Sequence, residues 1–234
     1  MFYKINYNKF NGGNKYEFEN KVIFFIGPNS PKNILSNLPD DVDYVICVSG
    51  NPKFSTDYFN LSKNHIIFTC LKPSSHHKDD LLNYVIDKGI KLRSNKLLYS
   101  SFLNGKQNCN NKCSKNITFT HDEIYKRIEN ELKKIKYSRA WASTGFYCLL
   151  DILFQDPKKV YINGVTWFHP KFNIYSDLTY NKSAKSILEN GWPDNLNANF
   201  KEEYKYLKKN YLLKNNIVLD NNLKWILNND NLLD

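Results

Sequence analysis

The three residues Ser143, Thr144 and Gly145 place two hydroxyl side chains and a glycine at the start of an apolar stretch. Apolar residues recur there at the spacing of a buried helix, which we expect over Thr144–Phe154. The first turn of a helix has backbone N–H groups without intrahelical partners and carries the positive end of the helix dipole. This pattern predicts a seat for a phosphate or carboxylate. The alternative is that a hydroxyl only caps the helix.

A second polar turn has the same character. Gly27, Asn29 and Ser30 follow directly on the apolar run at residues 22–26, and Gly164 ends another short apolar run. Open α/β sheets bind ligands where their strands end. Two polar, glycine-bearing turns of this kind therefore indicate a nucleotide held at the edge of such a sheet.

A third turn precedes the last long helical pattern. Asn199 and Glu202 have the spacing of a capping box, which predicts a helix that starts at about Phe200. Ala198 would then lie beside the positive end of that helix. A histidine there would be held neutral and could act as a general base, but the residue is alanine.

The elements that must position these turns follow from the apolar pattern. Continuous apolar runs predict strands buried on both faces, as in a parallel sheet flanked by helices. We therefore expect an α/β protein with a Rossmann-like, mostly parallel sheet, in a single domain over residues 1–234. The expected strands are Lys21–Ile26, Tyr44–Ser49, Ile66–Cys70, Lys96–Phe102 and Val160–Asn163. The expected helices are Lys78–Lys88, Asp122–Lys136, Thr144–Phe154, Phe200–Leu213 and Asn222–Asn228.

Two segments, Asn104–Thr118 and His169–Asn197, are polar and show no clear periodicity. Loops of that length in a compact domain are usually lids or binding loops. We expect residues 165–199 to form a lid or acceptor-binding region, because they follow the strand that ends at Gly164.

The charge balance favours anionic partners. Lys and Arg exceed Asp and Glu by 33 − 23 = 10. Nucleic acid, an acidic membrane surface, a sugar nucleotide or an acidic glycan would each satisfy this excess. The sequence shows no secretory leader and no run approaching the roughly 18 apolar residues of a spanning helix. We expect a soluble, cytoplasmic protein, with peripheral membrane association left open and the oligomeric state undetermined.

The cysteines give little support for a bound metal ion. Cys47, Cys70 and Cys148 lie in apolar segments and are expected to be buried free thiols. Cys109 and Cys113 lie in a polar loop, where a local disulfide is favoured over zinc. The chain has no Gly-x-Gly-x-x-Gly or Walker sequence, which argues against nicotinamide dehydrogenases and P-loop NTPases. We expect no metal and no cofactor.

The stretch from Ser138 to Phe168 resembles the sialyltransferases, especially the compact bacterial and viral-type enzymes. That family has a Ser-Thr-Gly or Thr-Ser-Gly turn before an apolar helix and a strand ending in glycine. Its first motif, a strand with a Gly/Asn turn that contacts the cytidine nucleotide, is similar to residues 22–34. The resemblance implies an inverting, metal-independent glycosyltransferase. Such an enzyme would transfer sialic acid or a related acidic sugar from a CMP-activated donor to a glycan hydroxyl.

The resemblance also implies site residues. The family's late motif, a histidine followed after four residues by an acid, falls on Ala198 and Glu203, with alanine in place of the catalytic base. Either the natural protein lacks the base or a substitution removed it, and the intact helix start favours the substitution. A tyrosine pair of the bacterial enzymes corresponds to Phe168 and Tyr175, with His169 as an alternative phosphate partner. The implied substrate-binding residues are Gly27, Asn29, Ser30, Ser49, Asn51, Ser143, Thr144, Gly145, Gly164 and Trp167.

In the implied reaction, a base removes the acceptor proton while helix starts and hydroxyls stabilise the departing phosphate. This requires the element starts at residues 143–145 and 198–200 to converge on one pocket. Two alternatives remain open. The net charge motivates transfer to another acceptor such as modified nucleic acid, and Ala198 motivates a catalytically inactive protein that binds nucleotide or glycan.

Overall fold

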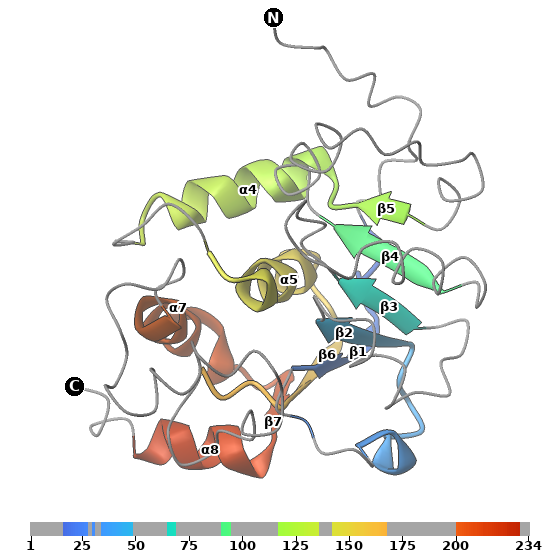
Figure 1. Ribbon diagram of the computed structural model, residues 1–234, viewed down its shortest axis with the longest axis vertical. Helices are drawn as coiled ribbons and strands as arrows, with labels where there is room; N and C mark the ends of the chain where they lie inside the picture. Colours follow the sequence, from blue (N-terminus) through green and yellow to red (C-terminus); the bar gives the residue numbers. More distant parts are fainter. Residues whose placement is uncertain are drawn as a thin grey trace, which may run out of the picture.

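Seven strands form one sheet in the order β5-β4-β3-β2-β1-β6-β7, and all six pairings are parallel (Figure 1). The computed structural model describes residues 16–27, 30, 34–48, 65–68, 90–94, 117–135, 142–167 and 200–229. The strands are β1 (Val22–Ile26), β2 (Tyr44–Val48), β3 (His65–Phe68), β4 (Lys91–Ser94), β5 (Ile117–Phe119), β6 (Lys159–Asn163) and β7 (Ile217–Leu219). The expected α/β fold with a parallel sheet is confirmed.

Helices flank this sheet. They are α4 (Asp122–Leu132), α5 (Thr144–Leu153), α7 (Phe200–Leu207) and α8 (Asn221–Asn228), with a short 3-10 helix η2 (Ile34–Asn37). A π-helical turn, η6 (Lys208–Leu212), continues α7. The four longer helices match helices expected from the sequence, whereas the helix expected over Lys78–Lys88 lies outside the described residues.

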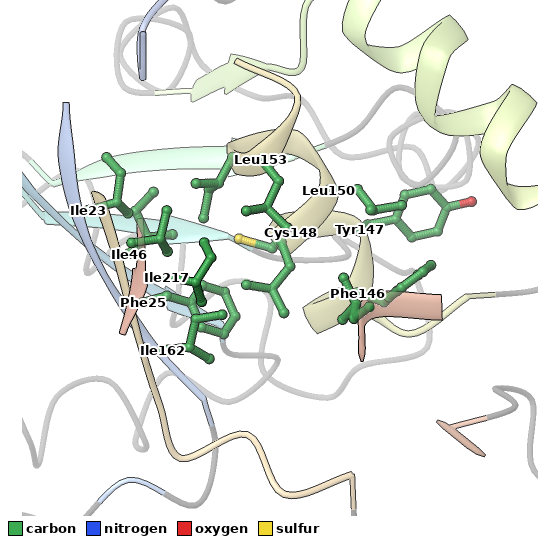
Figure 2. Close-up of a cluster of buried hydrophobic side chains, with 14 of the residues drawn as sticks. Ile23, Phe25, Ile46, Phe146, Tyr147, Cys148, Leu150, Leu153, Ile162 and Ile217 are labelled. Carbon is green, nitrogen blue, oxygen red and sulfur yellow. The ribbon is translucent and has the colours of Figure 1, made fainter. Parts of the chain in front are cut away.

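The core lies on both faces of the central strands. All five residues of β1 are buried, and the side chains of its last four residues, 23–26, alternate between two apolar clusters. Ile23 and Phe25 belong to the cluster that contains α5, and Figure 2 shows Cys148 and Leu153 of that helix near them. On the other face, Cys47 of β2 packs with residues of β1 and η2. Since Phe146–Leu153 of α5 are all buried, the start of this helix is held in a fixed place.

Three strands were not expected from the sequence. β7 is only three residues long, and β4 contains Lys91 and Arg93, whose charges conceal its burial. The sequence also assigned Ile117 and Thr118 to a long loop, but both belong to the edge strand β5. That expectation was wrong because a three-residue edge strand is too short to show an apolar period. The strand expected over Lys96–Phe102 lies outside the described residues.

Arg93 is fully buried and anchors α5 to β4. Its Nε and Nη2 atoms donate to Asp151 of α5 at 2.5 and 3.1 Å, and its Nη1 donates to Glu17 at 2.6 Å. The hydroxyl of Thr120 and the amide of Gln155 also donate to the Asp151 carboxylate. A buried guanidinium is tolerated only when its donors are paired in this way. The second half of α5 is therefore fixed by charge as well as by packing.

Two described thiols lie in this core, one on each face of the sheet. Cys47 and Cys148 are both buried and free, as the sequence predicted. Burial raises the pKa of each thiol above its usual value. Cys70, Cys109 and Cys113 lie outside the described residues.

Candidate functional site

The sheet reverses its strand order between β1 and β6. From β1 the chain builds outward through β2, β3, β4 and β5, and it then returns to add β6 and β7 on the other side of β1. In open α/β sheets, ligands bind outside the carboxyl ends of the strands at such a reversal. The residues that follow β1 and β6 are Gly27 and Gly164, which the sequence had singled out.

These two glycines lie against each other. The N–H of Gly27 donates to the carbonyl of Asn163 at 2.7 Å, and a Cβ on Gly27 would lie 2.5 Å from the carbonyl oxygen of Gly164. Gly164 has φ +66°, a left-handed conformation that glycine adopts without strain. Its N–H donates to Asp220 Oδ2 at 2.7 Å. The ends of β1 and β6 are thus joined by backbone contacts that no larger residue would permit.

Ser30 lies directly beside Gly164. A Cβ built on Gly164 would come within 2.2 Å of both the backbone nitrogen and the hydroxyl oxygen of Ser30. Ser30 is 6% exposed, and its hydroxyl has no hydrogen-bond partner among the residues that the structure describes. Buried hydroxyls are normally paired, so Ser30 offers a hydrogen-bonding group at the strand reversal that the described residues do not use.

Trp167 connects the exit of β6 to α7. It is buried against Tyr204, with ring centroids 5.2 Å apart. Its φ of 43° is rare for a large residue and marks a strained turn that the surrounding packing maintains. The sequence predicts that Trp167 binds substrate, and in the structure its ring packs against that of Tyr204.

Ser143 caps α5 and is itself held by α7. Its hydroxyl oxygen accepts the N–H of Phe146 at 3.1 Å, as expected for an N-cap. Its N–H donates to Glu203 Oε1 and its hydroxyl donates to Glu203 Oε2, both at 2.6 Å. The starts of α5 and α7 therefore meet through one serine and one glutamate that are sixty residues apart in sequence.

Glu203 is 0% exposed. Burial raises the pKa of its carboxyl to about 7, although both hydrogen bonds from Ser143 act in the opposite direction. No basic side chain of the described residues contributes to this shift. The site thus holds an acid whose charge changes near neutral pH, and no cation of the described ranges compensates it.

The next two residues of α5 have unused donors. In the described part of the chain, no group accepts the N–H of Thr144 or Gly145. A Cβ on Gly145 would meet nothing within 4 Å, so open space adjoins this turn. Two N–H groups at a helix start that have no acceptor in the described residues are suited to an anion.

All these groups belong to the same edge of the sheet. α5 and α7 each lead into a parallel strand, β6 and β7, so both helices begin at the carboxyl edge, where β1 and β6 end. Ser143 of the residue 143–145 turn contacts Glu203 of α7, whereas the shared pocket expected between residues 143–145 and 198–200 stays a prediction, because residues 198 and 199 lie outside the described part of the chain. The other expected site residues, Asn29, Ser49, Asn51, His169, Tyr175 and Ala198, lie outside the described residues.

Asp220 is a member of this edge that the sequence analysis missed. Its Oδ2 holds the N–H of Gly164, and its Oδ1 accepts the N–H of Leu223 at 2.7 Å to cap α8. An aspartate between a short apolar run and a helical pattern was the available signal. Its role is to fix the turn after β6.

Other features of the described residues do not supply a second centre of this kind. No group of three or more His, Cys, Asp or Glu residues among them could hold a metal ion. A cavity of about 300 Å³ is lined by Tyr16, Glu19, Glu123, Ile124, Arg127, Phe154, Gln155 and Asp156, none of which was an expected site residue. None of the helices in the described ranges is long and apolar enough to cross a membrane.

Comparisons with known proteins concern the fold. No protein-family model and none of the curated proteins matches the sequence. A solved structure of the sialyltransferase CST-II with a trisaccharide acceptor and CMP is similar at 14% identity and a TM-score of 0.47, over 85% of this chain and 80% of that chain. The sialyltransferase CstII from Campylobacter jejuni with the substrate analogue CMP-3FNeuAc is similar at 16% identity and a TM-score of 0.44, over 87% of each chain. Similarity at this level describes the course of the chain, so the function has to be argued from the residues of the site.

Proposed function

We propose that this protein is a glycosyltransferase that uses a CMP-activated acidic sugar of the sialic acid class. It would transfer the sugar to a glycan hydroxyl by an inverting, metal-independent displacement. The observation that carries the proposal is the meeting of the Ser143–Gly145 turn with Glu203 of α7, at the edge where β1 and β6 end. The sequence motifs around this turn supply the substrate class.

The departing nucleotide phosphate would be held by the start of α5. The N–H groups of Thr144 and Gly145 have no acceptor among the described residues, a Cβ on Gly145 would meet nothing within 4 Å, and the helix dipole favours negative charge there. Ser30, in the turn after β1, supplies an independent buried hydroxyl that has no partner in the described part of the chain. Charge that develops on a leaving phosphate is stabilised best by donors already in place before the reaction.

A nucleoside monophosphate leaves with less charge than a diphosphate, so donors from the protein can replace a metal ion in this scheme. The general base would occupy position 198, beside the start of α7, where the sequence has alanine. Tyr175 and His169 remain candidates for contacts with the phosphate. The roles of these three positions rest on the sequence motifs alone.

Ala198 gives a second candidate function. A protein with the donor site but without a base would bind a nucleotide or a glycan and would not transfer the sugar. Restoring the base distinguishes the two cases, because a histidine at position 198 can create activity only in a transferase.

The direct test is a calorimetric titration of the protein with CMP and, separately, with UDP. We expect saturable binding of CMP and much weaker binding of UDP. Binding of UDP without CMP would show that the donor belongs to another nucleotide class. Absence of binding by either nucleotide would overturn the proposed function.

A further inference from the structure

Ser143 has a single hydroxyl hydrogen, and in this structure that hydrogen is donated in a hydrogen bond to Glu203. The hydroxyl donates to Glu203 Oε2, while its oxygen accepts the N–H of Phe146. An ionised carboxylate can only accept hydrogen bonds, so it holds this hydrogen away from any ligand. Ser143, the first residue of the predicted anion-binding turn, therefore cannot donate its hydroxyl hydrogen to a ligand while Glu203 is charged.

A neutral Glu203 would reverse this arrangement. Its carbonyl oxygen could still accept the N–H of Ser143, and its own O–H would donate to the oxygen of Ser143. The hydrogen of Ser143 would then be free to turn toward the open side of the turn. It would join the N–H groups of Thr144 and Gly145 as a third donor.

Charge favours the same change. An ionised Glu203 already places a negative charge at the start of α5, and the positive end of a helix dipole amounts to only about half an elementary charge. A second anion at this turn would repel the carboxylate in a buried place where the repulsion is weakly screened. Uptake of one proton by Glu203 removes this repulsion.

Among the described residues, the groups around Glu203 do not offset its charge. Tyr147 of α5 lies close enough to Glu203 to be affected by its charge. The pKa of the Tyr147 phenol is raised to about 12, by burial first and then by the charges of Glu129 on α4 and of Glu203, so the phenol stays neutral. On α7 itself, Glu202 lies 3.6 Å from Lys205. From the exit of β6, the contact with α7 is the uncharged pair of Trp167 and Tyr204.

We propose that Glu203 is a positioning residue, and that binding of a phosphate-bearing ligand at the start of α5 is coupled to uptake of one proton by Glu203. The inference rests on the proposed function, since it assumes that the ligand phosphate occupies this turn. The proton comes from solvent, and no covalent bond of the ligand changes. The carboxyl group then changes from an acceptor of the Ser143 hydroxyl hydrogen to a donor to the Ser143 oxygen, which leaves that hydrogen available to the ligand.

The burial of Glu203 sets the pH range of this coupling. With the carboxyl pKa near 7, Glu203 is mostly charged at pH 8 and mostly neutral at pH 5.5. Binding at pH 8 therefore takes up nearly one proton, and binding at pH 5.5 takes up almost none. Linkage then makes the affinity fall by up to about tenfold for each pH unit above 7.

The experiment is calorimetric titration with CMP at pH 5.5 and pH 8, in buffers with different ionisation enthalpies, which yields the number of protons exchanged. The variant Glu203→Gln copies the neutral acid, because its amide oxygen can accept from Ser143 and its NH₂ group can donate to the serine oxygen. We expect this variant to bind CMP at pH 8 without proton uptake, about as tightly as at pH 5.5. It also corrects for titration of the CMP phosphate, whose second pKa is about 6.

The matched control is Glu202→Gln, which removes an equal charge from the same helix turn; Glu202 pairs with Lys205, whereas Ser143 bonds Glu203. It should keep the proton uptake and the pH dependence of the parent protein. CMP binding by the parent at pH 8 without proton uptake would overturn the inference and leave the proposed function intact. Loss of CMP binding in every protein at both pH values would overturn both. If Glu203→Gln does not fold, the buffer series on the parent protein still decides the matter.

Discussion

Gly27 and Gly164 hold the ends of β1 and β6 together by direct backbone contact. A Cβ on Gly27 would lie 2.5 Å from the carbonyl oxygen of Gly164 and 2.7 Å from Cγ2 of Val165. The contact lies at the point where the strand order of the sheet reverses. It joins the turns after the two strands, and Ser30 lies against the turn that follows β6. The geometry of the site therefore depends on two residues that have no side chains.

Alanine at position 27 should destabilise the protein. The added methyl group would overlap backbone atoms that cannot rotate away, and overpacking of this kind costs about 1–3 kcal/mol. Alanine at position 164 should cost more, because its left-handed φ adds strain of about 1–2 kcal/mol. Urea unfolding of Gly27→Ala and Gly164→Ala measures both losses, and unchanged midpoints would show that the contact is not tight.

Alanine at position 145 should have the opposite effect on stability. Gly145 lies in the first turn of α5 with open space around it, so its replacement should raise the free energy of unfolding by roughly 0.5–1 kcal/mol. CMP binding should weaken by about tenfold, because the methyl group occupies the space next to the free N–H groups. Unfolding and calorimetry on the same Gly145→Ala sample test both effects. Unchanged affinity would place the phosphate elsewhere.

The stability of the unliganded protein should depend on pH through Glu203. Its carboxyl pKa is raised from 4.5 to about 7 on folding, so the folded state binds more protons than the unfolded chain between these values. The stabilising contribution is therefore complete below pH 4.5 and is lost as the pH rises through 7, by on the order of 3 kcal/mol. The difference between the parent and Glu203→Gln in unfolding experiments across pH 4–8 isolates this contribution. A constant difference would mean that Glu203 does not titrate in this range.

The ion pair between Arg93 and Asp151 should be strongly coupled. Removal of one partner leaves a buried charge without its counter-ion, so Arg93→Met or Asp151→Asn should each cost about 3–5 kcal/mol. The double variant should cost less than the sum, because it leaves neither charge behind. A double-mutant cycle measured by denaturant unfolding gives the coupling energy. Additive losses would indicate that the two residues act independently.

Restoration of a histidine at position 198 tests the catalytic interpretation. In the proposed enzyme, Ala198→His should convert a protein that only binds CMP-sialic acid into one that transfers the sugar to some acceptor in a broad glycan panel. Product formation measured by mass spectrometry decides the question. CMP binding with no transfer to any acceptor would favour the binding-protein alternative.

The sequence predicted the parts of the fold that have long, regular apolar patterns. β1 and α5 were found because five consecutive buried residues and a helical apolar period leave little ambiguity. β4 was missed because Arg93 resembles a surface residue until its partners Asp151 and Glu17 are known. Such pairings join residues distant in the chain, and a local pattern cannot reveal them.

The same distinction applies to the site. The turn at Ser143 and the glycines that follow β1 and β6 were visible as local motifs, and their common sheet edge follows from parallel topology. The use of the Ser143 hydroxyl by Glu203 was not predictable, because the motif suggested that both would face a substrate. Asp220 escaped notice since its two hydrogen bonds depend on how β6 and β7 pair.

The two free thiols lie on opposite faces of the sheet, so their reaction with alkylating reagents can measure local opening of the core on each face. Alkylating reagents attack the thiolate, and burial keeps Cys47 and Cys148 protonated and out of reach. Modification of Cys148 thus requires α5 to move away from the strands, and modification of Cys47 requires the opposite face, covered by η2, to open. In a chain whose other cysteines are replaced by serine, the labelling rate at each thiol would record how often that face of the sheet comes apart.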